Sequence, residues 1–137
     1  MVVRVNAELD ESSVDDVKQC EDMIVNQSEV VLSSSTEDEV RQTLAELDKI
    51  LRPLGLETNL VVIRRANSLA IYFVCLTLSA LKNLRDQWSN GQLTDIVRSV
   101  CTLLSGASRE VCVKRLTWQK ADFERCLKFF EPLEGEQ

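Results

Sequence analysis

The side chains of this chain best suited to chemistry are its cysteines, and their spacing favours packing over reaction. There are five, scattered and without a C-x-x-C pair: Cys20, Cys75, Cys101, Cys112 and Cys126. Such a pattern predicts neither a disulfide framework nor a zinc ribbon. Histidine, the commonest general base near neutral pH and the commonest zinc ligand, is absent from the chain. We therefore expect no catalytic centre, no metal site and no cofactor, with the cysteines acting mainly as small hydrophobic side chains.

Two charged clusters are candidate binding groups. Glu37, Asp38 and Glu39 could hold a metal or act as catalytic acids, but they also fit the first turn of a helix, which we take as the better interpretation. Arg64 and Arg65 lie at the end of a predicted hairpin, where bidentate contacts could hold an acidic segment of a partner. The alternative for this pair is local compensation of an acidic surface.

Composition limits the class of partner. The chain has 137 residues, of which 45% are hydrophobic, enough for one core without disulfide or metal staples. Its net charge of −6 disfavours nucleic acid and anionic membranes, because such binding depends on Lys and Arg at the phosphates. The longest weakly charged stretch, residues 68–81, is too short to span a bilayer, and charged residues interrupt any signal peptide at the start. We expect a cytoplasmic protein with a protein partner and no membrane insertion.

Apolar periodicity in the second half predicts an α+β unit. Residues 60–64 and 69–76 are two strands rich in branched side chains, joined by a tight turn. Both strands are apolar at nearly every position, which suggests that both lie centrally in the sheet. A helical period then follows, and the remaining predicted elements are helices at 78–88 and 93–104, a strand at 111–116 and a helix at 122–130.

The first half is less regular. Val2, Val3 and Val5 could form an edge strand, and residues 14–25 have the spacing of a short amphipathic helix. Residues 30–32 read as a brief strand, followed by a helix that ends near Pro53 and Gly55. We divide the chain into an N-terminal arm or short helix (1–28), one α+β sandwich domain (29–131) and a polar tail (132–137). The expected fold is an antiparallel sheet of about four strands covered by helices on one face, a ferredoxin-like or related α/β sandwich.

Three segments together resemble a known family. They are IRRANSLAI at 63–71, WSNGQL at 88–93 and DFERCL at 122–127, supported by the helices predicted around them. In this order they are similar to the N-terminal domain of the TRADD family of tumour necrosis factor receptor adaptors. The likeness covers about two thirds of the chain, by pattern more than by identity.

The resemblance implies an adaptor rather than an enzyme. Members of the family have an α/β sandwich whose sheet and hairpin surface docks onto TNF-receptor-associated factors (TRAFs). Ile71 falls where the family has an interface isoleucine, whereas Arg64 and Ala66 replace a histidine and a serine. With Arg65 from the hairpin, these are the expected partner-binding residues: Arg64, Arg65, Ala66 and Ile71. The implied role is recruitment of signalling proteins in TNF-receptor, death or innate-immune signalling, including apoptosis.

Two other functions remain open at this point. A ferredoxin-like regulatory domain would pair two sheets in a dimer and bind a small metabolite at the interface. Thiol chemistry at Cys20 is the other alternative, because this thiol could be exposed, whereas the other four cysteines lie in predicted strands or on apolar helix sides.

Overall fold

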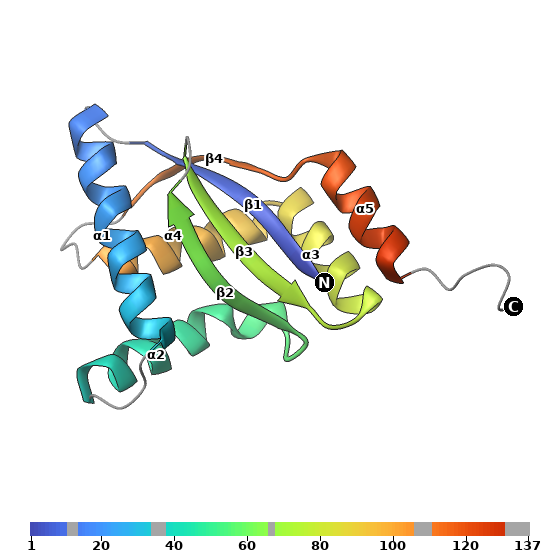
Figure 1. The fold of residues 1–137 in the computed structure, drawn as a ribbon, viewed down its shortest axis with the longest axis horizontal. Helices are drawn as coiled ribbons and strands as arrows, with labels where there is room; N and C mark the ends of the chain where they lie inside the picture. Colours follow the sequence, from blue (N-terminus) through green and yellow to red (C-terminus); the bar gives the residue numbers. More distant parts are fainter. Residues whose placement is uncertain (11–13, 34–37, 66–67, 106–110, 131–137) are drawn as a thin grey trace, which may run out of the picture.

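In a computed structural model, the described residues form an antiparallel sheet with helices packed on one face (Figure 1). The structure describes residues 1–10, 14–33, 38–65, 68–105 and 111–130. The sheet has four strands in the order β2-β3-β1-β4: β1 (Val2–Leu9), β2 (Thr58–Arg65), β3 (Leu69–Cys75) and β4 (Val113–Thr117). The helices are α1 (Val14–Ser33), α2 (Asp38–Leu51), the short 3-10 helix η1 (Arg52–Leu54), α3 (Leu78–Ser89), α4 (Gln92–Ser105) and α5 (Lys120–Phe130). The predicted α+β class is confirmed, and the finer ferredoxin-like label stays a prediction.

None of the described helices combines the length with the apolar character that a membrane crossing requires.

Strand β1 lies in the centre of the sheet, so the expectation of an edge strand in a separate arm was wrong. It pairs with β3 from Val2 to Ala7, and its second half also pairs with β4. Side chains alternate along it, with Val3, Val5, Ala7 and Leu9 buried. The alternation runs over eight residues, but the polar side chains between the apolar ones obscure it in the sequence. Residues 1–10 and 14–28 therefore belong to the same sheet-and-helix unit as the rest of the fold, whereas the predicted tail 132–137 lies outside the described residues.

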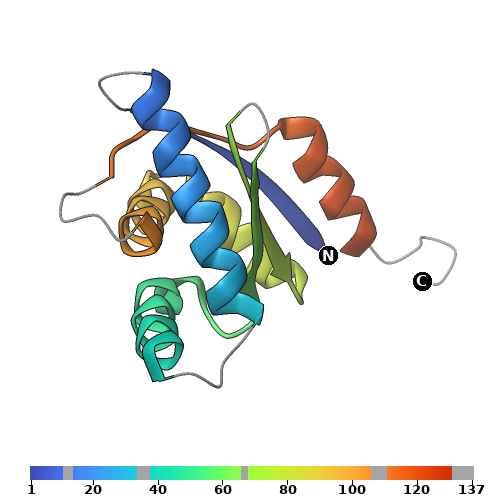
Figure 2. The same ribbon diagram turned by 60° about the vertical axis from the view of Figure 1, so that its left-hand side comes forward.

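Residues 30–32 belong to α1 and do not form a strand. The buried side chains of this helix follow at spacings of three and four, with Ile24, Ser28 and Val31 on one stripe. Val30 and Val31 point to opposite environments, being 46% and 1% exposed. A run of three branched residues is too short to override a helical stripe that continues through it. The helix α1 passes along β2 and α4, as Figure 2 shows with the sheet turned towards its edge.

The core lies between the inner face of the sheet and the helices α1 to α4, of which α3 and α4 are behind the strands in Figure 1. Thr77 begins α3, because its side chain accepts a hydrogen bond from the N–H of Ala80 at 3.1 Å. Gly91 separates α3 from α4 with a φ of 89°, a conformation that favours glycine. The two helices bury a continuous apolar surface against the sheet: Leu81, Leu84, Leu93, Val97, Val100, Cys101 and Leu104.

Different elements protect the two edges of the sheet. Strand β4 covers only the second half of β1, and α5 continues this edge along the first half, where Cys126 Sγ donates to the C=O of Val2 at 3.9 Å. At the opposite edge is β2, which the sequence had placed centrally together with β3. The apolar side chains of β2 reflect the neighbouring helix α1 rather than a strand on each side. A register shift between Leu60 and Val62 adds a bulge, a common protection of sheet edges.

An arginine surrounded by aromatic rings joins α3, β4 and α5. The guanidinium carbon of Arg85 lies 4.3 Å from the ring centroid of Trp88, 5.1 Å from that of Trp118 and 4.7 Å from that of Phe123. Arg85 also donates to the C=O of Trp118 at 3.1 Å, and Trp88 Nε1 donates to the C=O of Leu116 at 2.9 Å. Burial lowers the pKa of Arg85, but a guanidinium keeps its charge at neutral pH. This cluster fixes the C-terminal strand and helix to the core.

Replacement of Arg85 by alanine should destabilise the fold by about 1–3 kcal/mol, because cation–π contacts and a hydrogen bond to a buried carbonyl are lost together. The measurement is the urea midpoint at constant m-value. Lys82, exposed on the same helix, gives the matched control, and Lys82→Ala should change stability by less than about 0.5 kcal/mol. Equal midpoints for the two variants would contradict this role.

Candidate functional site

The sheet face opposite α3 and α4 is the candidate functional site, here named the outer face. In Figure 1 the strands β1, β2 and β3 lie in front of α3 and α4, with no described helix over them. Alternation along β1 places on this face four side chains that are exposed or half-buried: Val2, Arg4, Asn6 and Glu8. Val2 is 55% exposed, an unusual environment for a valine in a central strand.

An aromatic and aliphatic strip crosses the outer face. Arg4 pairs with Tyr72 across β1 and β3, and Tyr72 pairs with Val62 across β3 and β2. The guanidinium carbon of Arg4 lies 6.0 Å from the centroid of the Tyr72 ring, within cation–π range. In the next row on the same face, Val2 lies opposite Val74. Both Tyr72 and Val74 are only half-buried, so the strip is open to a binding partner.

The charge of the outer face opposes that of the whole chain. Arg4, Arg64 and Arg115 are exposed on it, whereas the acidic side chain in the same rows is Glu8, directly opposite Arg115. The complete chain carries a net charge of −6. A positive patch on an acidic protein attracts and orients an acidic surface. It also repels a second copy of itself.

The four predicted partner-binding residues differ in where they lie in the structure. Arg64 is exposed on the outer face and forms no ion pair with a described residue. Ile71 was wrongly expected on a surface patch, since it lies on the inner face between Val5 and Ile63 and is only 1% exposed. Every second side chain of β3 faces the core, and Ile71 is one of them. Ala66 lies outside the described residues.

Arg65 forms ion pairs with side chains of α1, so it is not free to bind a partner in the way that was expected. Its Nη1 pairs with Asp22 and its Nε lies 3.8 Å from Oε1 of Glu21, so it connects the end of β2 to α1. The side chain of Glu21 is 8% exposed. Burial raises the pKa of Glu21 above its usual range, and the nearby charge of Arg65 only partly opposes this shift.

Two residues of the site were missed in the sequence. Arg4 lies in the segment that was interpreted as an arm, and Tyr72 was one apolar position among many in a predicted strand. The alternation from Val2 to Leu9 was the signal that could have found Arg4. No comparable signal marks Tyr72, because its exposure depends on which face the helices cover.

The cysteines are mostly packed in the core. Burial raises the pKa of Cys75 and Cys126, and it raises the pKa of Cys101 to about 12. A thiol with a raised pKa is a poor nucleophile at neutral pH, because the thiolate is the reactive form. Cys112 is exposed, and Cys20 is half-buried on α1, where its proposed thiol chemistry stays a prediction.

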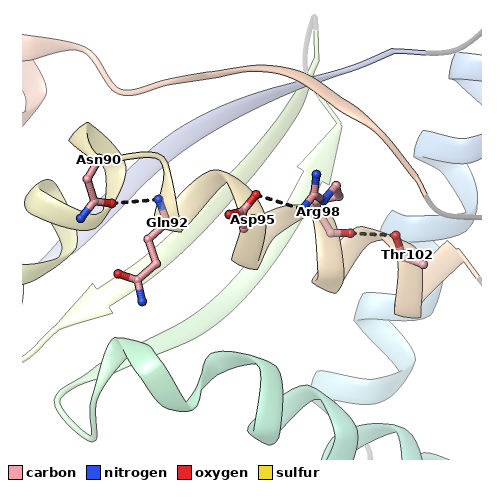
Figure 3. Close-up of polar contacts among 5 residues, drawn as sticks. All are labelled: Asn90, Gln92, Asp95, Arg98 and Thr102. Carbon is pink, nitrogen blue, oxygen red and sulfur yellow. Dashed lines mark hydrogen bonds and ion pairs between the residues drawn. The ribbon is translucent and has the colours of Figure 1, made fainter.

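A row of polar side chains follows α4, and its contacts are those of a helix surface (Figure 3). Oδ1 of Asn90 accepts from the N–H of Gln92 at 2.9 Å at the start of the helix. Arg98 pairs with Asp95 at 2.9 Å, and Thr102 Oγ1 donates to the C=O of Arg98. Thr102 Oγ1 also accepts from the N–H of Val111, which fixes the segment before β4 to the helix. The row therefore caps α4 and attaches a neighbouring segment, and it contains no nucleophile paired with a base.

Glu21→Gln isolates the pH dependence of the buried carboxylate. The raised pKa means that the folded state binds this proton more readily than the unfolded state, so the contribution of Glu21 to stability is present at low pH and is lost as pH rises through the raised pKa. The variant should be at least as stable as the parent at pH 7, and its advantage should shrink as the pH falls towards 4.5. Urea unfolding across this range measures the difference, with the exposed Glu46→Gln as control. An advantage that grows on acidification would contradict the burial of Glu21.

Thiol labelling tests the packing of the cysteines. Cys112 should react rapidly with iodoacetamide at pH 8, whereas Cys75, Cys101 and Cys126 should react only on unfolding. Mass spectrometry of digests at successive times identifies the labelled residue, and Cys112→Ser should remove the rapid phase. Rapid labelling of Cys101 in the folded protein would show that the core is open.

The outer face is suited to recognition. It offers guanidinium groups, an aromatic ring and aliphatic side chains, which are side-chain types enriched in protein interfaces. In the part of the chain that the structure describes, no group of three His, Cys, Asp or Glu side chains could hold a metal ion. No family model, no curated protein and no solved structure matches this chain.

Proposed function

We propose that this protein is a non-catalytic interaction module, an adaptor or scaffold that recruits a signalling partner in the cytoplasm. The observation that carries the proposal is the outer face, an open and positively charged sheet surface on an acidic chain. Rigid sheets present side chains in fixed rows at little entropic cost, which suits recognition of another protein.

The partner is a protein segment that carries both carboxylates and apolar side chains. Arg4 and Arg64 lie in neighbouring rows and can each hold a carboxylate, while Tyr72, Val62 and Val74 offer an apolar strip. Aromatic and arginine side chains contribute most of the binding free energy in many protein interfaces. This composition favours an acidic segment with exposed aliphatic or aromatic residues.

The resemblance to TRADD-family adaptors supports the same proposal. It extends the role to TNF-receptor, death or innate-immune signalling, including apoptosis, with a TRAF-family or other signalling protein as partner. Arg64 lies at a position compared with the family's interface and is exposed on the outer face, although this chain has arginine where the family has a histidine. Ile71 takes no direct part, because it is buried.

A metabolite-binding dimer, the alternative from the sequence, fits the outer face less well. Two sheets packed face to face would bring Arg4, Arg64 and Arg115 of both copies together. Bringing like charges together at a desolvated interface typically weakens binding by roughly several kcal/mol. The charge of this face thus favours a different protein over a second copy.

The test is a random-peptide phage display selection on the full folded chain. The selected peptides should be rich in Asp, Glu and apolar residues, and their affinity should fall as salt rises. Arg4→Glu/Arg64→Glu should weaken their binding at least tenfold. The control Lys82→Glu/Lys128→Glu makes the same charge change on exposed positions of α3 and α5, and it should alter binding less than twofold.

Circular dichroism and thermal unfolding establish that both double variants are folded. Peptides that bind the Arg4→Glu/Arg64→Glu variant as tightly as the parent would overturn the assignment of the outer face.

A further inference from the structure

A second concave surface lies between α2 and the beginning of β2, here named the α2–β2 groove. It is a hollow of about 570 Å³ whose lining contains neither Arg4 nor Arg64. Four half-buried leucines form most of its apolar lining, namely Leu32, Leu44, Leu51 and Leu60. Leu32, one of these leucines, comes from the last turn of α1.

The free edge of β2 forms one wall of this groove. The N–H of Leu76 donates to the C=O of Glu57 at 2.8 Å, so this pair is a hydrogen-bonded one. Alternation in an antiparallel ladder then directs the N–H and C=O groups of Thr58 and Leu60 away from β3. Cys75, the partner of Thr58, confirms this direction, because its own N–H and C=O bond to Met1 on the opposite side.

These edge groups have no backbone partner in the described part of the chain. Among the hydrogen bonds between its separate elements, none involves the N–H or C=O of Thr58 or Leu60. Both residues line the groove. An apolar hollow thus adjoins a short run of unpaired peptide groups.

We propose that the α2–β2 groove binds an extended segment of another polypeptide by strand addition to β2. The backbone of that segment pairs with Thr58 and Leu60, and its alternate side chains enter the hollow between the leucines of α1, α2 and β2. This inference adds a second docking site and does not depend on the outer face.

Charges on the helical wall specify the segment further. Asp48 and Arg52 both line the groove about one helical turn apart, and neither forms an ion pair with a described residue. A segment that carries a basic and an acidic residue beside its apolar ones therefore complements both the charges and the leucines of the groove.

The rest of β2 restricts the length of the added strand. Beyond Leu60 the bulge interrupts the edge, and α1 lies along the remaining residues, held by the ion pair of Arg65 with Asp22. A second copy of β2 would need a longer free edge for a continuous sheet. The groove consequently fits a short peptide segment and excludes pairing between two whole β2 strands.

The probe is a set of 12-residue peptides selected by phage display on the full chain carrying Arg4→Glu/Arg64→Glu, a background in which the outer face is disabled. Selected peptides should contain alternating apolar residues together with at least one basic and one acidic residue. Binding to the parent chain should slow amide hydrogen exchange at Thr58 and Leu60 at least tenfold. Methylation of alternate peptide nitrogens should abolish binding.

Leu44→Lys places a charge in the lining and should weaken the selected peptides at least tenfold. Met23→Lys, an exposed apolar position on α1 outside the groove, is the matched control and should leave affinity unchanged. The proposal is overturned if the selection yields no binder, if binders ignore Leu44→Lys, or if the amides of Thr58 and Leu60 exchange at the rate of the free protein. If the Leu44→Lys variant does not fold, amide exchange at Thr58 and Leu60 in the parent chain still tests whether the peptide pairs with β2. Failure of the outer face would leave these results unaffected, so the two proposals fail separately.

Discussion

The central position of β1 is the constraint on which the rest of the structure depends. Its inner side chains Val3, Val5 and Ala7 lie under the helices, and its outer side chains include Arg4. Its backbone joins β3 along one side and is shared between β4 and α5 along the other. One strand therefore organises the core, both sheet faces and the attachment of the C-terminal elements. Loss of its register by one residue would exchange the buried and exposed side chains.

The second half of the fold could be predicted because its signals are local. Hairpin, paired helices, strand and last helix each have a period or turn that short-range physics determines, and all lie where they were expected. Two features of the first half could not be predicted in this way. Residues 30–32 look like a strand in isolation, and only burial of Val31 in line with Ile24 shows the helix. The place of β1 depends on pairing with Val74 and Leu116, which no local pattern contains.

The candidate site follows the same division. Arg64 was identified from the hairpin, but whether a strand residue faces solvent or core depends on which face the helices cover. Ile71 and Tyr72 are neighbours in the sequence with opposite environments for this reason. Arg65 has a charge that suggested recognition, yet its partners Asp22 and Glu21 come from α1, which was predicted as an arm or short helix outside the sandwich domain. The α2–β2 groove likewise results from the packing of a helix beside an edge strand, so the apolar periodicity of the sequence could not predict it.

The pairing of β1 with segments far along the chain has a consequence for biosynthesis. During translation β1 is made before its neighbours β3 and β4, and β4 is the last of the four strands to emerge. Non-local pairings of this kind fold slowly, because loop closure precedes any compensating contact. Until then its valines are exposed to chaperones and to other nascent chains. The β2–β3 hairpin can assemble early, whereas the completed sheet must wait until β4 has been synthesised.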